Sequence, residues 1–228
     1  MTSTDVRQRP DTHEMIVVHR IFRREASLLP QLVRAVPDGS TERAALIAQH
    51  FRDYQLGLHH HHTGEDELVW PLLLARVDLE AELVLRMEAQ HDVITRSLAD
   101  VNSALPAWEA APSAATAEPV TAALSAHLSA LHEHLADEED NILPLIAEHL
   151  TVAEWARLGQ RFASETPKDK LLVFLGAILE EAGPAERAKI MGNLPVSARL
   201  AWRVIGRRQY ARKTTRLRAG ISSPPRGR

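Results

Sequence analysis

Residues 58–73 read LHHHHTGEDELVWPLL, four consecutive histidines followed by acids and an apolar run. Such a stretch is compatible with an internal purification tag, a solvated polar loop or one wall of a metal site. On a helix with roughly 100° per residue, residues four apart point the same way, so His61 and Glu65 share one direction. Leu58 and Leu72 fall on that same side of the helix. The His61–Glu65 pair is therefore predicted to face an apolar core.

The other histidines of the run take different directions on this helix. His62 lies about 60° from Glu65 and can also reach inward, whereas His59 is marginal. His60 lies about 140° away and is predicted to be in solvent. We therefore expect His61 to coordinate a metal, His62 to act as a reserve ligand and the other two to be bystanders.

The pattern occurs a second time in residues 134–146, which read HLADEEDNILPLI. His134 aligns with His61. Glu138 aligns with Glu65, and in each copy a proline follows the glutamate at the same distance. Two copies in register are not expected of a tag or a polar loop. The repeat predicts two helices that each present a histidine and a carboxylate to the interior.

Converging carboxylates in a core need compensation. A buried ionised carboxylate costs several kcal/mol unless it is paired, protonated or bound to a cation, and two of them also repel each other. Solvated glutamates beside boundary histidines are the alternative for a single pair. For two matched pairs, a cation between Glu65 and Glu138 removes the repulsion and uses the histidines as neutral nitrogen donors.

Two further histidines lie on apolar helix faces. His19 shares its face with Met15 and Phe22, and His91 shares its face with Ile94. Each of these histidines alone would be read as a core residue. Together with the two His-Glu pairs they supply one inward histidine from every helix of a four-helix bundle, which favours a shared metal site.

Helical periodicity with few β-branched runs predicts an all-α protein. An up-down four-helix bundle with a binuclear metal site and a C-terminal helical extension is the expected architecture. The link PAWEAAPSAATAEP, residues 106–119, is expected to be a Pro- and Ala-rich connection. The four long helices are predicted over residues 12–36, 42–77 with a bend at Pro71, 80–105 and 120–149.

The C-terminal part differs in charge from the rest. Residues 151–195 are predicted to be a helical extension packed on the bundle, with a capping box at Thr151. Residues 196–228 are predicted to form a basic amphipathic helix and a frayed tail. Residues 187–228 hold twelve Lys or Arg and no acid, which leaves fifteen basic against thirty acidic residues in the rest.

These residues resemble the hemerythrin-like family of HHE cation-binding domains over about residues 10–150, which we treat as one domain. The family's four-helix bundle holds two irons through histidines and two bridging carboxylates, so the resemblance implies the same here. The metal ligands that it implies are His19, His61, Glu65, His91, His134 and Glu138, with His62 as a candidate replacement for a ligand that the chain lacks.

The chain departs from the family pattern at two positions. Met87 stands where the third helix should have its earlier histidine, and it is a poor ligand for iron. Glu138 lies four residues after its histidine, whereas oxygen carriers have an Asp one residue later, where this chain has Glu139. Glu88 and Glu139 are further candidate replacements. His127 faces inward roughly 10 Å along the helix from the fourth-helix pair and is predicted to be a core histidine.

The resemblance and the donor set favour two non-haem Fe ions, with Zn or Mn as competitors. The expected function is binding of dioxygen, hydrogen peroxide or nitric oxide, for oxygen or redox sensing or for iron and oxygen handling. A peroxide-decomposing di-iron oxidoreductase is the alternative. A metal-free helical interaction module is a further alternative.

The chain contains no cysteine, no apolar leader and no apolar run long enough for a membrane span, so we expect a soluble cytoplasmic protein. The basic C-terminal helix is expected to contact anionic lipid, or to dock through Trp202 while its arginines meet the protein's own acidic surface. Nucleic-acid binding is disfavoured, because such sites stack bases on several aromatic side chains and this segment has two, Trp202 and Tyr210.

Overall fold

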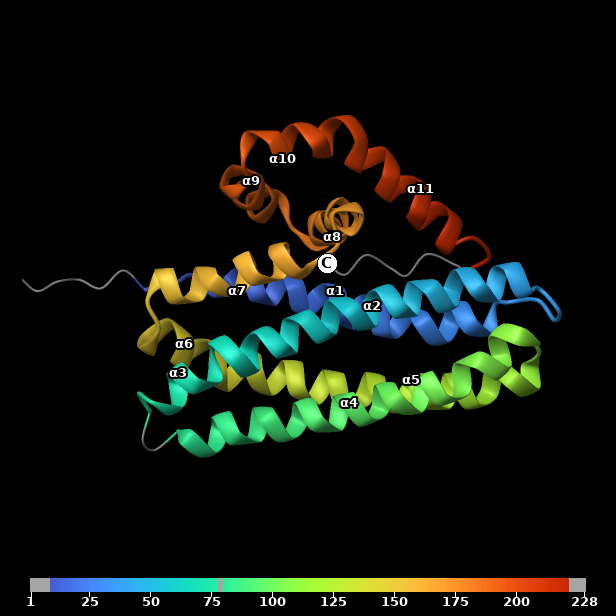
Figure 1. The fold of residues 1–228 in the computed structure, drawn as a ribbon, viewed down its shortest axis with the longest axis horizontal. Coiled ribbons are helices and arrows are strands. Elements are labelled where there is room, and N and C mark those ends of the chain that lie inside the picture. The colour runs from blue at the N-terminus through green and yellow to red at the C-terminus, as the bar shows by residue number, and fades with distance from the viewer. Residues whose placement is uncertain (1–8, 78–79, 222–228) are drawn as a thin grey trace, which may run out of the picture.

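The computed structural model describes residues 9–77 and 80–221, and these residues form helices and connecting turns with no strand. The prediction of an all-α chain is confirmed for them. Four long helices lie side by side in a helical bundle (Figure 1). They are α1 (His13–Arg34), α2 (Thr41–Leu68), α4 (Ala81–Ala110) and α5 (Ala114–Asp137).

Both helices that carry the repeated pattern change direction or pitch after their glutamates. α2 ends at Leu68, and α3 (Trp70–Leu74) begins directly before Pro71. Proline is tolerated in a first helical turn, because its missing N–H would have no partner there. The second predicted helix is therefore two helices. In the other copy, α5 continues into a π-helical segment, η1 (Glu138–Ile142), and then α6 (Leu143–His149) with Pro144 in its first turn.

The Pro- and Ala-rich stretch 106–119 is mostly helical, where a connection was expected. α4 continues beyond the predicted end at Leu105, and Trp108 is fully buried. α5 begins at its capping residue Ser113, whose hydroxyl accepts a hydrogen bond from the Thr116 N–H at 3.2 Å. The high helix propensity of alanine and the burial of Trp108 outweigh Pro106 and Pro119, which lie inside the two helices.

Two apolar clusters fill the bundle, and a polar layer separates them. Each long helix, together with the residue or turn directly after it, contributes flanking residues to both clusters. These pairs are Met15 and Phe22, Val69 and Leu58, Met87 and Ile94, and Ile142 and Leu131. The sequence between the members of these pairs contains all seven predicted ligands, so the four helices bring them to one level of the bundle.

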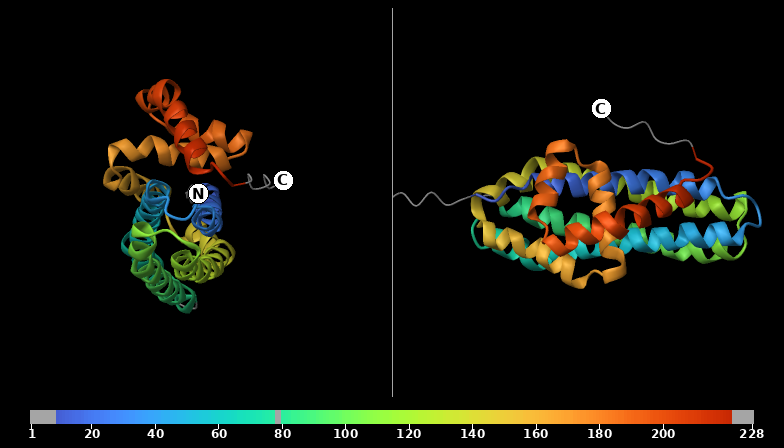
Figure 2. Two further views of the ribbon diagram at one scale, coloured as in Figure 1. Left: turned by 90° about the vertical axis from the view of Figure 1, so that its right-hand side faces the viewer. Right: turned by 90° about the horizontal axis from the view of Figure 1, so that it is seen from above.

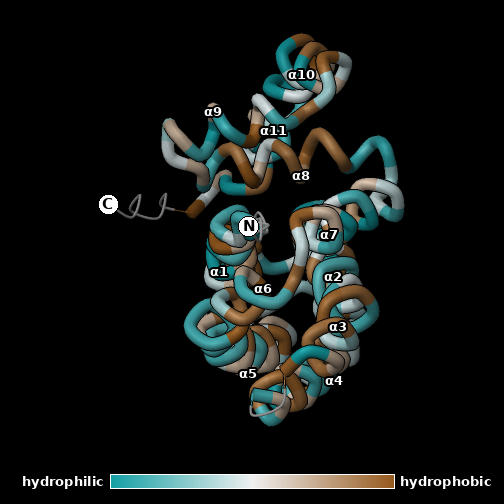
Figure 3. Tube along the Cα trace, turned by 90° about the vertical axis from the view of Figure 1, so that its left-hand side faces the viewer, coloured by the Kyte–Doolittle hydropathy of each residue, from teal (hydrophilic) through white to brown (hydrophobic). Residues whose placement is uncertain are grey.

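Further helices cover one side of the bundle: α7 (Val152–Glu165), α8 (Lys168–Glu181), α9 (Pro184–Asn193), α10 (Val196–Ala201), the π-helical η2 (Trp202–Gly206) and α11 (Arg207–Leu217). α7 packs along α2, and α8 packs on α1 and α11 (Figure 2). The predicted capping box at Thr151 is present, since its hydroxyl accepts from the Glu154 N–H at 3.2 Å. Figure 3 shows α8 to α11 on the side of α1 and α2, away from α4.

Glycines on α2 allow the covering helices to come close. A β-carbon at Gly57 would lie 2.9 Å from the Phe174 ring of α8, and one at Gly64 would lie 2.5 Å from the Leu158 side chain of α7. Any larger residue at these positions would push α7 or α8 away.

No helix of residues 9–77 and 80–221 is both long and apolar enough to cross a bilayer. The last part of the predicted basic tail, residues 222–228, lies outside the described residues.

Candidate metal centre

α1 contributes one fully buried histidine, His19. Its Nδ1 is hydrogen-bonded to Glu139 Oε1 at 2.8 Å, and the same oxygen accepts from Arg23 at 2.6 Å. With Nδ1 held in this way, Nε2 points into the polar layer and lies 3.3 Å from Glu138 Oε2. The ring is thus oriented by one acid and directed at another.

α2 contributes three residues of the layer: His61, His62 and Glu65. The exposed fractions of their side chains are small, and Glu65 is 1% exposed. His61 Nδ1 lies 3.3 Å from Glu65 Oε1, one helical turn away. The His62 ring stacks on that of His91 with centroids 4.0 Å apart. The helical spacing thus brings both histidines and the carboxylate inward, as expected from the sequence.

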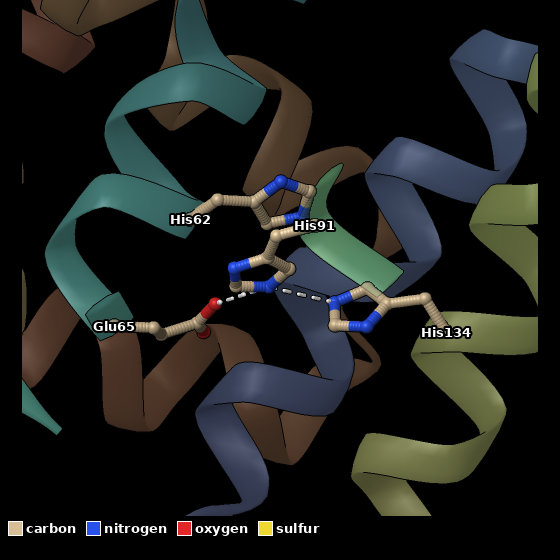
Figure 4. A group of neighbouring side chains, drawn as sticks. All are labelled: His62, Glu65, His91 and His134. Carbon is tan, nitrogen blue, oxygen red and sulfur yellow. Dashed lines mark hydrogen bonds and ion pairs between the residues drawn. The ribbon is translucent and has the colours of Figure 1, made fainter. Parts of the chain in front are cut away.

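α4 and α5 contribute His91 and His134. His91 Nδ1 is hydrogen-bonded to Asp66 Oδ1 at 2.7 Å, and His134 Nδ1 to Gln90 Oε1 at 3.2 Å. The two Nε2 atoms face each other at 3.2 Å, and His91 Nε2 lies 3.6 Å from Glu65 Oε2 (Figure 4). Both rings therefore direct Nε2 to the same point between the helices.

The seven predicted ligands fall into two groups, which we call together the histidine cluster. Within each group, one donor atom per residue lies within 4.8 Å of all the others. One group consists of His62, Glu65, His91 and His134, and the other consists of His19, His61 and Glu138.

Each glutamate lies between the two groups. Glu65 approaches His61 with one oxygen and His91 with the other. Glu138 Oε2 lies 3.3 Å from His19 Nε2 and 3.7 Å from His134 Nε2. Since the contacted histidines belong to different groups, each carboxylate is placed where it could contact two cations at once.

Apart from the Nε2 atoms of His91 and His134, which contact each other, the donor atoms of the cluster have no hydrogen-bond partner among the described residues. Both oxygens of Glu65 and of Glu138 are buried without a hydrogen bond, and so is Nε2 of His19, His61 and His62. Buried polar atoms in proteins are nearly always hydrogen-bonded, and each exception requires a physical reason. A cation coordinated by these atoms is such a reason, so the residues present fit a metal site.

Burial keeps His61, His62 and His134 neutral, whereas at His19 the nearby Glu138 and Glu139 outweigh burial and raise the pKa. Burial lowers the pKa of His61 and of His62 well below the ordinary value of histidine, and it lowers the pKa of His134 to about 4. A neutral imidazole offers a lone pair to a metal, whereas a protonated one does not. The low pKa values therefore prepare these rings as ligands near neutral pH.

The two glutamates cannot both be ionised at low cost in this surrounding. Burial, and next the nearby Glu138 carboxylate, raise the pKa of Glu65. Burial also acts to raise the pKa of Glu138, but His19, together with His134 and His61, outweighs it and brings the value to about 2. Among the described residues, no lysine or arginine pairs with either glutamate. A cation between them would stabilise both in the ionised form.

The orienting residues Asp66, Gln90 and Glu139 were not predicted in that role. Each is the immediate neighbour of a cluster residue on its own helix and holds the histidine of a different helix. Asp66 follows Glu65 in sequence and holds His91. Such hydrogen bonds fix the tautomer and direction of metal-binding rings and raise their affinity for the metal. The sequence signal that could have identified these orienting residues is a polar side chain directly beside a predicted ligand.

The other histidines and acids of the sequence analysis lie outside the cluster. Glu139 is hydrogen-bonded to His19 Nδ1, and Glu88 is exposed. His127 is fully buried and bonds the Tyr54 hydroxyl at 2.6 Å. His60 was predicted to be in solvent, but it is half-buried against Phe162, because α7 covers this face of α2.

A pocket of about 510 Å³ lies between α2 and α4, opens to solvent and reaches the cluster. His62 and His91 form part of its wall, together with the polar side chains of Thr63, Asp66 and Asp92. A small polar molecule can therefore reach two of the metal-facing rings from outside.

Buried histidines and carboxylates with free donor atoms are the ligand set of a cation-binding helical bundle. A family model described as the hemerythrin HHE cation binding domain matches residues 11–146. The chain therefore belongs to this family, as the resemblance predicted. Searches of curated proteins and of solved structures gave no match.

Proposed function

We propose that residues 10–150 form an up-down four-helix bundle around two iron ions and that Glu65 and Glu138 bridge them. The observation that carries this proposal is the placement of each glutamate between two groups of histidines, with its oxygens unpartnered. A carboxylate from each of two helices, with histidines from the others, is a known way to build such a centre.

The donor set favours iron over softer metals. Nitrogen and carboxylate oxygen donors suit iron or manganese, and zinc is the main competitor. Met87 is fully buried within an apolar cluster, and the structure places His62 beside His91 in the polar layer. His62 is therefore our replacement for the histidine that the family pattern has at position 87.

The proposed role is binding of dioxygen, hydrogen peroxide or nitric oxide, for sensing or for iron and oxygen handling. Iron bound in the cluster would supply a redox-active centre with a coordination position open to such a ligand. The chain itself orients the rings through Asp66, Gln90 and Glu139. It also surrounds the cluster with apolar layers, and the cavity between α2 and α4 gives a route to it.

Peroxide decomposition is the second candidate function. It is favoured by the polar wall of the opening, where Thr63, Asp66 and Asp92 can donate or accept hydrogen bonds with peroxide. The overall reaction converts two H₂O₂ into two H₂O and one O₂, so no other reductant is needed. Reversible dioxygen binding, in contrast, generally requires a more apolar, guarded opening.

Anaerobic loading with Fe(II), followed by elemental analysis and an optical spectrum, tests the centre. We expect two irons per chain for the wild type and a loss of iron for Glu65→Gln, Glu138→Gln. Glu67→Gln on the exposed side of α2 is the matched control and should retain both irons. Stopped-flow mixing with peroxide then separates the two functions: evolution of O₂ supports the enzyme, and a stable spectral change with dioxygen supports a carrier or sensor.

The absence of cysteine from the chain suits a reducing compartment, and we propose a cytoplasmic location on that ground. We further propose that residues 151–195 form an extension that covers the bundle and that residues 196–228 act as a separate basic segment.

A further inference from the structure

The helix that runs from α10 through η2 into α11 carries one continuous exposed stripe. Every fourth residue from position 196 to 216 is exposed. In order, these residues are Val196, Leu200, Val204, Arg208, Arg212 and Arg216. The first half of the stripe is apolar and the second half is cationic. Val196 is 70% exposed and Leu200 61% exposed, far from the burial usual for such side chains.

The π-helical segment keeps this stripe on one side of the helix. An α-helix has 3.6 residues per turn, so positions four apart rotate steadily around it. A π-helix closes hydrogen bonds over five residues and has more than four residues per turn, so the same positions rotate the opposite way. η2 lies in the middle of the stripe and offsets part of the rotation.

Most arginines of the outer face have no counter-charge among the described residues, and Arg216, at the end of the stripe, pairs with exposed Glu42 at 3.4 Å. Among the described residues, Arg203, Arg207, Arg208 and Arg212 form no ion pair. Inward cations of the same helix behave differently. Lys213 pairs with Asp53 of α2 at 2.7 Å, and Arg218, which follows α11, pairs with Glu180 of α8 at 2.6 Å. The helix thus docks by one face and presents unneutralised arginines on the other.

The aromatic residues of this segment are turned inward. The Trp202 ring packs over Gly206, where a β-carbon would lie 2.4 Å from it. Trp202 and Tyr210 line a hollow of about 430 Å³ against α8 and α9, and Arg203 and Arg207 stand in its wall. The expected docking of Trp202 is thus on the extension and not on the four long helices. The hollow offers guanidinium groups to a phosphate at the edge of the stripe.

We propose that the stripe from Val196 to Arg216 binds the surface of an anionic phospholipid bilayer. Val196, Leu200 and Val204 would enter the boundary between headgroups and acyl chains, and the arginines would contact lipid phosphates. α10 lies on the far side of the molecule from α4, so the long helices leave the stripe free to approach a flat surface (Figures 1 and 3).

Other occupants fit the stripe less well. In a two-fold dimer the same patch would face itself, and the arginines of one copy would oppose those of the other. Single-stranded nucleic acid needs exposed stacking aromatics, and both aromatic residues of this segment face the hollow. Isolated exposed valines and leucines have no role in contacts to a phosphate backbone.

The test is co-sedimentation of the full-length protein with two kinds of vesicle: phosphatidylcholine alone, and phosphatidylcholine mixed in equal parts with phosphatidylglycerol. We expect binding to the anionic vesicles that weakens as salt rises. Arg208→Ser, Arg212→Ser should bind roughly 30-fold more weakly, from about 1 kcal/mol per arginine near such a surface. Leu200→Ser, Val204→Ser should lose at least about tenfold.

Matched controls separate the stripe from general surface effects. Leu85→Ser, Val93→Ser removes exposed apolar side chains of α4, and Arg96→Ser, Arg157→Ser removes exposed arginines from α4 and α7. Both control proteins should bind vesicles as the wild type does. All variants should keep the helical circular dichroism signal and the metal content of the wild type.

Several results would overturn the proposal. These are equal binding to both kinds of vesicle, no binding to either, or stripe variants that bind as the controls do. Light scattering would assign the stripe to a second copy instead if the wild type were a dimer and the Leu200→Ser, Val204→Ser variant a monomer. Binding of duplex DNA that the arginine variant abolishes and the apolar variant leaves intact would assign it to nucleic acid.

Discussion

Two clusters of buried charge in this molecule are neutralised in different ways. The histidine cluster holds two carboxylates and five histidines, with unpartnered donor atoms. The second cluster surrounds Glu25 on α1, and we call it the Glu25 cluster. Glu25 accepts from Arg24 at 2.6 Å and bonds His50 at 2.9 Å. Arg24 and Arg218 in turn pair with Glu180 of α8.

The comparison separates a structural charge cluster from a metal site. The protein supplies its own cations to Glu25, and every oxygen of that carboxylate has a partner. Burial alone would raise the pKa of Glu25, but His50 and Arg24 outweigh it and lower the value to about 2. The pKa of Glu65, in contrast, is raised. Both carboxylates are buried, so the presence of internal cations decides the difference.

The largest expected effect comes from neutralising the carboxylates of the histidine cluster. Glu65→Gln, Glu138→Gln should abolish iron binding, as elemental analysis after loading would show. The metal-free variant should melt at a higher temperature than the metal-free wild type, on the order of 5 °C for about 2 kcal/mol, because it lacks two converging buried carboxylates. A wild type that binds no transition metal, or a variant that binds as much, would contradict the proposed centre.

The same change in the Glu25 cluster should have the opposite effect on stability. Glu25→Gln leaves Arg24 and His50 buried without their shared counter-charge, so we expect a loss of about 3–5 kcal/mol in urea unfolding. Iron content should be unchanged, because the two clusters share no residue. If the Glu25→Gln protein were as stable as the wild type, internal pairing would not stabilise Glu25, and the two clusters would not differ in the proposed way.

The Glu25 cluster also predicts a pH dependence. The carboxyl has a lower pKa in the folded chain, about 2, than the ordinary value of 4.5. Its stabilising contribution is therefore complete above pH 4.5 and is lost as the pH falls towards 2, by roughly 3 kcal/mol in all. The difference in unfolding free energy between wild type and Glu25→Gln should shrink over this range. The measurement runs from pH 6 to pH 2, about 4 units that include both pKa values. A free-energy difference that stays constant over this range would show that the carboxyl is not paired as described.

A smaller effect is expected from the orienting residues. Asp66→Asn keeps the size of the side chain but weakens its hold on the His91 Nδ1–H, so iron affinity should fall by about 10–100-fold. Competition with a chelator measures this, and stability without metal should change little. Asp92→Asn, in the wall of the same opening, is the control. Equal affinity of the Asp66 variant and the control would assign Asp66 no role in holding the ring.

The smallest effect is expected from an exposed ion pair. Arg52 pairs with Glu109 at 2.5 Å, but its side chain is 45% exposed. Arg52→Ala should cost less than about 1 kcal/mol and leave iron binding unchanged. A loss as large as that of Glu25→Gln would mean that internal pairing, and not burial, sets the size of the effect.

The inward direction of the side chains in the histidine cluster could be predicted because helical spacing determines which residues share a face. His61 and Glu65 lie one turn apart, and His134 and Glu138 repeat that spacing. The orienting residues could not be predicted in the same way, because Asp66 holds a histidine of a different helix. Their role depends on how the helices are rotated against each other, and periodicity within one helix does not contain that information.

The errors of prediction came from neighbours in space. His60 was expected in solvent because periodicity does not show that α7 would cover it. The stretch 106–119 was expected to be a connection because its three prolines were given more weight than its alanines and the buried Trp108. The placement of Glu139 beside His19 and Arg23 depends on the π-helical turn η1, which no residue pattern announced.

The turn η1 has a consequence for how this site could change over evolutionary time. A π-helical turn contains one residue more than an α-helical turn, so Glu138–Ile142 is equivalent to a single-residue insertion in a long helix. Deleting one exposed residue there, such as Asp140, would restore regular α-helical winding and leave the residues from Pro144 onward facing close to their present direction. This turn could thus absorb a length change of one codon while the helix half that carries His134 and the half that closes the end of the bundle keep their faces.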